Sequence, residues 1–253
     1  MKLLQIAALA MLCLFCSNPA VSTMQEISEK NSNVGKGREI LLKAVAAAGG
    51  LETFKQIDNF RIKTNSVIFQ SQGQTPLTVT EVIQLPDKTK QTMALKQGKR
   101  VQVLNSDQSW KQVGNNISDL SEAEKREMRR GLFRETINIF RMTASDSLQV
   151  EYLDKETIGG QSSHILQIKN QSADFFRLYI DTATFLVTKK VYQGAPEVGL
   201  VTLEEKYSDY RTVDGIKIPF HTLVRANGRK FIESDVVEAK FNLPLEDDFF
   251  LKD

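Results

Sequence analysis

Hydrophobic residues near the N-terminus recur at helical spacing along one face of the chain. That face is formed by Ile40, Leu41, Ala44, Val45 and Ala48. Such spacing is typical of an amphipathic helix, which we expect from about Arg38 to Ala48. Gly49-Gly50 interrupts the pattern and predicts a bend, followed by a short helical turn over residues 51–56. Residues 23–36 are polar and predict a flexible segment ahead of the helix.

From Asn59 onward the hydrophobic period changes to two, which is the period of a strand with one buried face. Phe60 and Ile62 begin the alternation, and it returns over 77–85 and 101–103. Later strands are expected over residues 151–158, 163–169, 175–180, 186–193, 200–207, 216–225 and 231–241. Short polar turns join them, and Asn227-Gly228 suits the type I′ turn of a hairpin. Neighbouring strands are therefore expected to be antiparallel, because parallel pairs need long crossovers.

A helical segment interrupts the strands. Ser121 and Glu124 have the spacing of a capping box, and good helix formers follow it to residue 130. Residues 132–142 are then more apolar than a single buried helix face requires. This apolar segment is a candidate cover over the sheet, and a plain core helix is the equal alternative.

These patterns predict a mainly β fold with α cover. We expect a curved antiparallel sheet of about eleven strands, with one helix group before it and one between the fourth and fifth strands. A sheet this long must curl to bury a face, and helices segregated from the strands then cover its concave side. A curled sheet with a helical cover has the expected shape of a container.

The N-terminus has the pattern of an export signal. Lys2 precedes an apolar run over residues 3–15, and Ala20-Val21-Ser22 offers small residues for cleavage after Ser22. The run is shorter than the roughly 20 apolar residues that span a bilayer, so a membrane anchor is disfavoured. Lipidation at Cys16 is also less favoured, because Phe15 is large where such signals require a small residue. We therefore expect a signal peptide over 1–22, a flexible N-terminus over 23–36 and a single domain over 37–253.

Composition limits the chemistry of the exported chain. Cys13 and Cys16 both lie within the predicted signal, so neither a disulfide nor a thiolate is expected after cleavage. The formal net charge is +2, which gives no electrostatic reason to expect nucleic acid as a partner.

Motifs for catalysis do not emerge from the sequence. His164 and His221 lie on different expected strands at no metal-site spacing, so no metal or other cofactor is predicted. There is no Gly-x-Ser-x-Gly elbow, and Glu204-Glu205 should point to opposite faces of one strand. We therefore predict a protein that is not an enzyme.

Four segments carry a resemblance to a known family. They are Ala-Val-Ala-Ala-Ala-Gly-Gly-Leu-Glu-Thr-Phe over 44–54, Tyr-Ile-Asp-Thr-Ala-Thr over 179–184, Tyr-Ser-Asp-Tyr at 207–210 with Val-Asp-Gly-Ile-Lys-Ile-Pro at 213–219, and the closing Phe241-Asn242 with Asp-Asp-Phe-Phe at 247–250. The chain resembles the LolA/LolB-like outer-membrane lipoprotein-sorting family in these segments. The resemblance implies an eleven-stranded half-barrel with an apolar lining and a helical lid, a periplasmic location and binding of acyl chains.

Our leading hypothesis is therefore a periplasmic carrier or chaperone for hydrophobic ligands, either lipid or lipoprotein acyl chains, in contact with an outer-membrane receptor or membrane surface. Alternation gives the candidate lining residues Phe60, Ile62, Phe69, Met93, Trp110, Phe133, Ile137, Phe140, Phe176 and Leu178. The alternative is the same fold with a filled core, used as a structural or protein-interaction module. A hydrolase is the weakest hypothesis.

Overall fold

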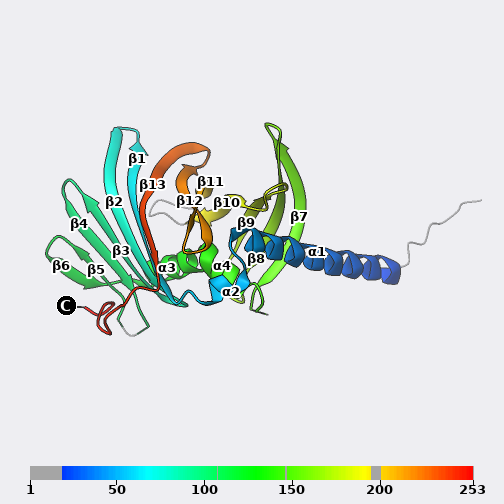
Figure 1. Ribbon diagram of the computed structural model, residues 1–253, viewed down its shortest axis with the longest axis horizontal. Coiled ribbons are helices and arrows are strands. Elements are labelled where there is room, and N and C mark those ends of the chain that lie inside the picture. Colours follow the sequence, from blue (N-terminus) through cyan, green and yellow to red (C-terminus); the bar gives the residue numbers. More distant parts are fainter. Residues whose placement is uncertain (1–18, 107, 146, 195–200, 253) are drawn as a thin grey trace, which may run out of the picture.

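The computed structural model describes residues 19–106, 108–145, 147–194 and 201–252, with side chains from residue 31 onward. Thirteen antiparallel strands form one curved sheet in the order β6-β5-β4-β3-β2-β1-β13-β12-β11-β10-β9-β8-β7 (Figure 1). The strands are β1 Asn59–Gln70, β2 Gly73–Gln84, β3 Lys88–Leu95, β4 Gly98–Leu104, β5 Trp110–Val113, β6 Asn116–Asp119, β7 Gln149–Ile158, β8 Gln161–Lys169, β9 Phe175–Asp181, β10 Val187–Gly194, β11 Val201–Val213, β12 Ile216–Ala226 and β13 Arg229–Phe241. The predicted mainly β, half-barrel class is confirmed.

The strand count corrects the expectation of eleven. Strand β3 (Lys88–Leu95) had no predicted range, and neither had β5 and β6, which have only four residues each. So short a segment cannot display a convincing alternation. The second helix group therefore lies between the sixth and seventh strands, not between the fourth and fifth.

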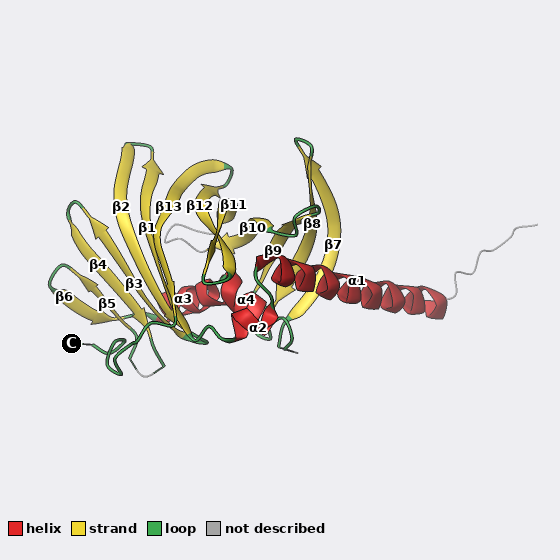
Figure 2. Cartoon of the chain, viewed as in Figure 1, coloured by secondary structure: helices red, strands yellow, loops and turns green. Residues whose placement is uncertain are grey.

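Within the described ranges, four helices accompany the sheet. They are α1 Pro19–Ala48, α2 Leu51–Lys55, α3 Glu122–Arg134 and α4 Thr136–Met142. Helices α3 and α4 lie within the curve of the sheet, so they cover its concave face (Figure 2). The end of α1 packs beside β7, and its beginning extends beyond the sheet (Figure 1).

Helix α1 begins earlier than the hydrophobic pattern indicates. The stretch 23–36, expected to be flexible, is helical in the structure. Straight-chain polar residues such as Gln25, Glu26 and Lys30 are good helix formers, so the absence of an apolar face does not exclude a helix. Most of the predicted signal peptide, residues 1–18, lies outside the described residues.

The local turn and cap predictions are confirmed. The Ser121 hydroxyl accepts the Glu124 backbone N–H, and the Glu124 side chain accepts the Ser121 backbone N–H. Asn227 and Gly228 have φ of 47° and 78°, as a type I′ turn requires.

The glycine pair after α1 is explained by a close crossing. Gly49 has a φ of 139°, and a Cβ there would lie 2.6 Å from the Gly215 carbonyl oxygen. Gly215 lies in the turn between β11 and β12, so two segments of the family resemblance meet at this point. The contact fixes the end of α1 against the sheet.

Alternation places the main hydrophobic core on the concave face. It packs residues of α1, α2 and α4 against Phe60, Ile83, Leu166, Phe176 and Leu178. A smaller cluster lies on the convex face, where the C-terminal tail returns across the sheet. There Phe250 packs with Val103 and Trp110, and the Trp110 indole N–H donates to the Phe250 carbonyl at 3.3 Å.

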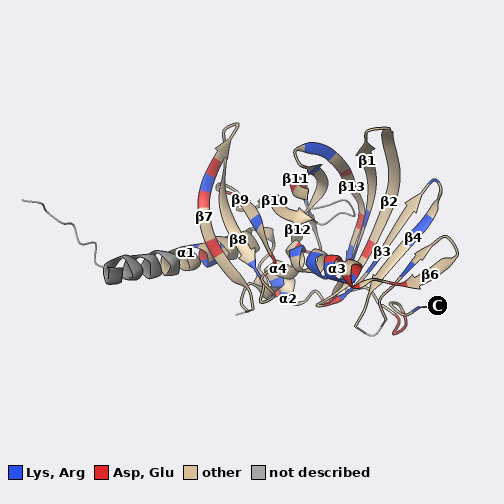
Figure 3. Cartoon of the chain, turned by 180° about the vertical axis from the view of Figure 1, so that it is seen from behind, with Lys and Arg blue, Asp and Glu red and all other residues tan. Residues whose placement is uncertain are grey.

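Charged residues are distributed rather than gathered in one patch. Acidic and basic side chains alternate on α3 (Figure 3), where Lys125 pairs with Glu122 at 2.9 Å and Arg134 with Glu127 at 2.7 Å. The edge strand β7 also carries several charges, and Asp154 is among its exposed residues. Charges on an edge strand discourage pairing with another chain.

Candidate functional site

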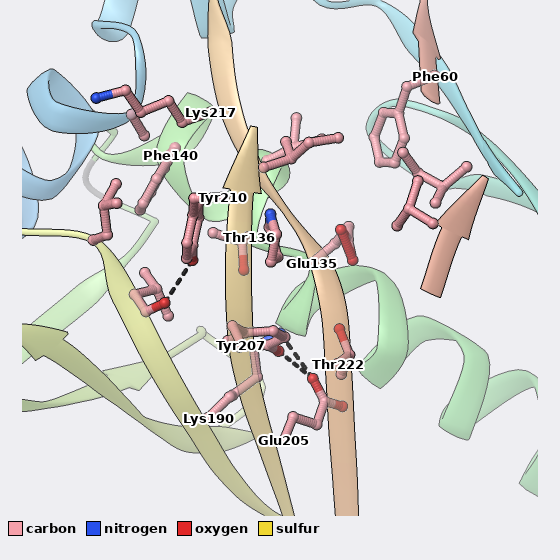
Figure 4. A pocket seen from close by; sticks show the side chains of 18 of the residues that line it. Phe60, Glu135, Thr136, Phe140, Lys190, Glu205, Tyr207, Tyr210, Lys217 and Thr222 are labelled. Atoms are coloured by element: carbon pink, nitrogen blue, oxygen red, sulfur yellow. Dashed lines mark hydrogen bonds and ion pairs between the residues drawn. The ribbon is translucent and has the colours of Figure 1, made fainter. Parts of the chain in front are cut away.

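A cavity of about 290 Å³ lies on the concave face beneath α4. Its walls come from α1, α2 and α4 and from strands β1, β2 and β10 to β13. The apolar part of the lining consists of Ala44, Ala48, Phe54, Phe60, Ile62, Ile137, Phe140, Leu186, Val187, Ile218, Pro219, Val224 and Val236. Figure 4 shows the side chains converging from the sheet and the helices.

Strand register explains why β1 and β13 contribute to this wall. Phe60 pairs with Phe241 and Ile62 with Ala239, so their side chains share the concave face. A bulge between Lys63 and Thr64 shifts the register by one residue and brings Thr64 opposite Val236. Bulges bend a strand and increase its twist, which suits a sheet that curls around a cavity.

The sheet opens at the cavity, between β12 and β13. Their pairing runs from His221–Asp235 to Ala226–Arg229. The rest of β12 pairs with β11 alone, and the rest of β13 pairs with β1. Pro219 lies in the part of β12 that has no β13 partner. Its missing backbone N–H therefore leaves no bond to β13 unmade. Pro219 therefore lies at a local edge of the sheet.

A buried polar network also lines the cavity. The Lys190 ammonium is 3.6 Å from the Glu205 carboxylate, which also accepts the hydroxyl of Tyr192 at 2.6 Å and that of Tyr207. Burial opposes ionisation of Glu205, but Lys190 and the two hydroxyls outweigh it and hold the pKa of that carboxyl below its usual value. Glu205 is therefore an ionised, fully partnered side chain (Figure 4).

Two further carboxyl groups face the same cavity. Burial, followed by repulsion from Glu135, raises the pKa of Glu81 to about 7, although the Thr89 hydroxyl donates to it at 3.3 Å. Burial also raises the pKa of Glu135, against the attraction of Lys190. Three acidic groups and one ammonium thus share the lining with the apolar residues, since Glu81 is the cross-strand neighbour of Ile62 and Glu205 that of Val224.

The predicted lining residues lie in several different places. Phe60, Ile62, Ile137 and Phe140 line the cavity. Phe176 and Leu178 are buried in the concave core, and the Phe176 ring lies 5.4 Å from that of Phe133. Met93 pairs with Val79 on the concave face but lies outside the cavity lining. Phe133 lines a second hollow of about 610 Å³ between α3, α4 and nearby loops.

Phe69 and Trp110 correct the alternation argument. Ile68 faces inward, so the next residue, Phe69, faces outward. The Lys230 ammonium covers the Phe69 ring, 4.1 Å from its centroid. Trp110 contacts the C-terminal tail. Both side chains therefore lie on the convex face, because alternation separates two faces without indicating which one is covered.

The polar lining was missed by the sequence argument. Glu81 occupies an inward position between Val79 and Ile83, and Glu205 one between Leu203 and Tyr207. An acidic residue within an apolar alternation was the signal available. The adjacent acid Glu204 pairs with Arg225 and points to the other face, in line with the expectation for Glu204-Glu205.

Neither histidine lies in the cavity. His221 contacts Asp235 at 2.8 Å, and His164 lies between Tyr152 and Phe185. Within the described ranges, no group of three histidine, cysteine or acidic residues could hold a metal ion. No helix in the described part of the chain combines the length and apolarity needed to cross a bilayer.

The architecture defines a class: an unclosed antiparallel half-barrel with helices and a cavity on its concave side. No family model and no curated protein matches the sequence. Solved structures do. A LolA superfamily protein from Nitrosomonas europaea aligns with a TM-score of 0.56 at 12% identity, covering 80% of this chain and 96% of that one.

Two other structures share the fold. An outer membrane lipoprotein-sorting protein domain from Vibrio parahaemolyticus gives a TM-score of 0.56 at 13% identity, covering 87% of this chain and 97% of its own. A DUF1329 family protein from Desulfovibrio piger gives 0.58 at 12% identity, with coverage of 86% and 97%. The resemblance to LolA-like proteins is thus confirmed at the level of the fold.

Proposed function

We propose that this protein binds and carries a hydrophobic ligand, a lipid or the acyl chains of a lipoprotein, in the cavity beneath α4. The observation that supports this most is the cavity itself. Side chains as large as Phe54, Phe60 and Phe140 surround about 290 Å³ that they do not fill. Ligand sites are typically concave, largely apolar and about 300–1,000 Å³ in size, so this cavity is at the small end of the range.

The energetics favour a hydrocarbon chain as the occupant. Burying one methylene contributes about 0.8 kcal/mol, so a chain of about ten carbons contributes roughly 8 kcal/mol before the losses of association. Those losses are about 4 kcal/mol or more. The remaining free energy allows weak to moderate binding by the chain alone, which suits a carrier that must also release its ligand.

The location is proposed from the N-terminus and from the fold. Residues 1–22 have the pattern of a secretory signal, and one of the structures with this fold is an outer membrane lipoprotein-sorting protein domain. We place the protein in the periplasm, where the hydrocarbon chain of a transported lipid must be kept out of water. Delivery to a membrane surface or an outer-membrane receptor is part of the same proposal.

The carrier proposal can be tested by placing a larger side chain in the cavity. Val236 lines it, whereas the next residue, Val237, is 50% exposed and lies outside the lining. Val236→Phe should therefore occupy ligand space, and Val237→Phe is a control matched in chemistry and strand. The neutral dye N-phenyl-1-naphthylamine reports binding by fluorescence, and native mass spectrometry reports co-purified lipid.

We expect saturable dye binding and a lipid adduct for the wild type and for Val237→Phe. Val236→Phe should weaken dye binding at least about tenfold, which corresponds to 1.4 kcal/mol. Dye binding that does not saturate, or that is equal in the two variants, would contradict the carrier and favour a scaffold with a filled interior.

A further inference from the structure

The charges that face the cavity do not balance. Lys190 is only 4% exposed, and its ammonium lies 3.6 Å from Glu205. Glu205 also accepts two tyrosine hydroxyls, so this part of the network is complete. The positive charge of Lys190 is therefore already matched by one carboxylate.

Glu81 and Glu135 have no cation of their own. Within the described residues, no hydrogen bond or ion pair reaches the Glu135 carboxylate, and Glu81 accepts only the Thr89 hydroxyl, at 3.3 Å. The other cation of the lining, Lys217, is exposed, and its side chain points away from Glu135 in Figure 4. Two acidic side chains thus line the cavity with no ion-pair partner among the described residues.

Such an arrangement is costly when the cavity is empty. A carboxylate removed from water loses solvation, and a neighbouring carboxylate adds repulsion. Both penalties disappear if a positive group enters the cavity. In the empty protein, protonation of the carboxyl groups relieves these penalties, whereas a positive group in the cavity relieves them with the carboxylates ionised.

We infer, building on the carrier function proposed above, that the ligand is an amphiphile whose polar end carries a protonated amine. Glu81 and Glu135 bind the ammonium group, and the hydrocarbon chain lies against the apolar wall formed by Phe60, Ile62 and Phe140. A hydrogen bond to a charged partner is about twice as strong as a neutral one, so the amine gives the site its specificity.

Other ligand chemistries fit the site less well. A fatty acid or a bare phosphate brings negative charge toward two acidic groups that already repel each other. A calcium ion requires about six to eight oxygen ligands, far more than two carboxyl groups and neighbouring hydroxyls supply. An ammonium group needs only a few acceptors and tolerates apolar surroundings through its attached chain.

The experiment compares head groups on one chain length. Isothermal titration of the protein at pH 8 is carried out with decylammonium, decan-1-ol and decanoate, each below its aggregation threshold, and with propylammonium as an amine without a long chain. The same series is repeated with the Glu81→Gln/Glu135→Gln double variant. Glu246→Gln, in the exposed part of the C-terminal tail, is the control that removes a charge elsewhere.

The wild type and Glu246→Gln should bind decylammonium at least about tenfold more tightly than decanoate, with no measurable binding of propylammonium. In the double variant this preference should fall below about threefold, while the affinity for decan-1-ol stays within about threefold of wild type. The decan-1-ol result also shows that the variant is folded with its cavity intact.

Each contrary result has a separate meaning. Equal affinity of the wild type for decylammonium and decanoate would overturn the amine inference and leave the carrier proposal standing. A preference for decylammonium that survives in the double variant would overturn the assignment to Glu81 and Glu135. Propylammonium binding as tightly as decylammonium would show a small-amine site instead. Failure of all three decyl ligands to bind would remove both proposals.

Discussion

Replacing Glu81 by glutamine should make the protein less sensitive to alkaline pH. Burial raises the pKa of Glu81 to about 7 from an ordinary value of 4.5. The folded state therefore holds the proton of Glu81 more tightly than the unfolded state does. The stability that this confers is fully present below pH 4.5 and is lost as the pH rises toward and through 7.

The magnitude follows from the shift. A difference of 7 − 4.5 = 2.5 pKa units corresponds to about 3 kcal/mol, because each unit is worth 1.36 kcal/mol. Glutamine has nearly the same shape, cannot ionise and can still accept the Thr89 hydroxyl. The free energy of unfolding of Glu81→Gln should therefore exceed that of the wild type by about 2–3 kcal/mol more at pH 8 than at pH 5.

Urea unfolding at several pH values between 5 and 8 measures this difference. The protein contains one tryptophan, Trp110, which is buried on the convex face. Its fluorescence reports unfolding on the face of the sheet opposite to the substitution, and circular dichroism provides the second probe needed to establish two-state behaviour. Glu246→Gln is again the control, since an exposed glutamate should leave the pH profile unchanged. Wild-type and Glu81→Gln profiles that run parallel from pH 5 to 8 would refute the reasoning.

Two further predictions concern the contacts that hold the half-barrel in shape. Phe250→Ala should lower the free energy of unfolding by about 3–4 kcal/mol, because the C-terminal tail covers the convex cluster. The same substitution should expose Trp110 to acrylamide quenching, and quenching equal to wild type would contradict this. Gly49→Ala should lower the melting temperature more than Gly50→Ala does, since both have positive φ but only a Cβ at 49 meets the Gly215 carbonyl. Equal melting temperatures of the two variants would show that the crossing at Gly215 is not tight.

Much of this fold could be predicted from the periodicity of the sequence. Alternation located most of the longer strands, although β3 was given no range and β11 runs to Val213 instead of residue 207. Turn chemistry fixed the hairpin at Asn227-Gly228. The capping box at Ser121 located the start of α3. These features are determined by neighbours in the chain, so local patterns are sufficient to find them. The four-residue strands β5 and β6 exist because adjacent strands pair with them, and no local pattern records that.

The site was harder to predict because it depends on which face of each strand is covered. Trp110 and Phe60 look alike in sequence, yet one packs under the C-terminal tail and the other beneath the helices. The polar network was inaccessible for a similar reason. Lys190 and Glu205 lie on neighbouring strands, and only the pairing of β10 with β11 sets them side by side.

The polar lining also bears on the choice between a carrier and a scaffold. A half-barrel that needed only a filled interior would gain from apolar residues at positions 81 and 135, because replacing buried charged groups by well-packed apolar ones is often neutral or stabilising. This chain instead keeps both carboxyl groups at a hollow, where Glu81 alone lowers stability by about 3 kcal/mol at alkaline pH. Residues that lower stability are expected at functional sites, where another interaction compensates for the lost free energy. A ligand that is bound through these groups would provide that compensating interaction, and a solid core would not.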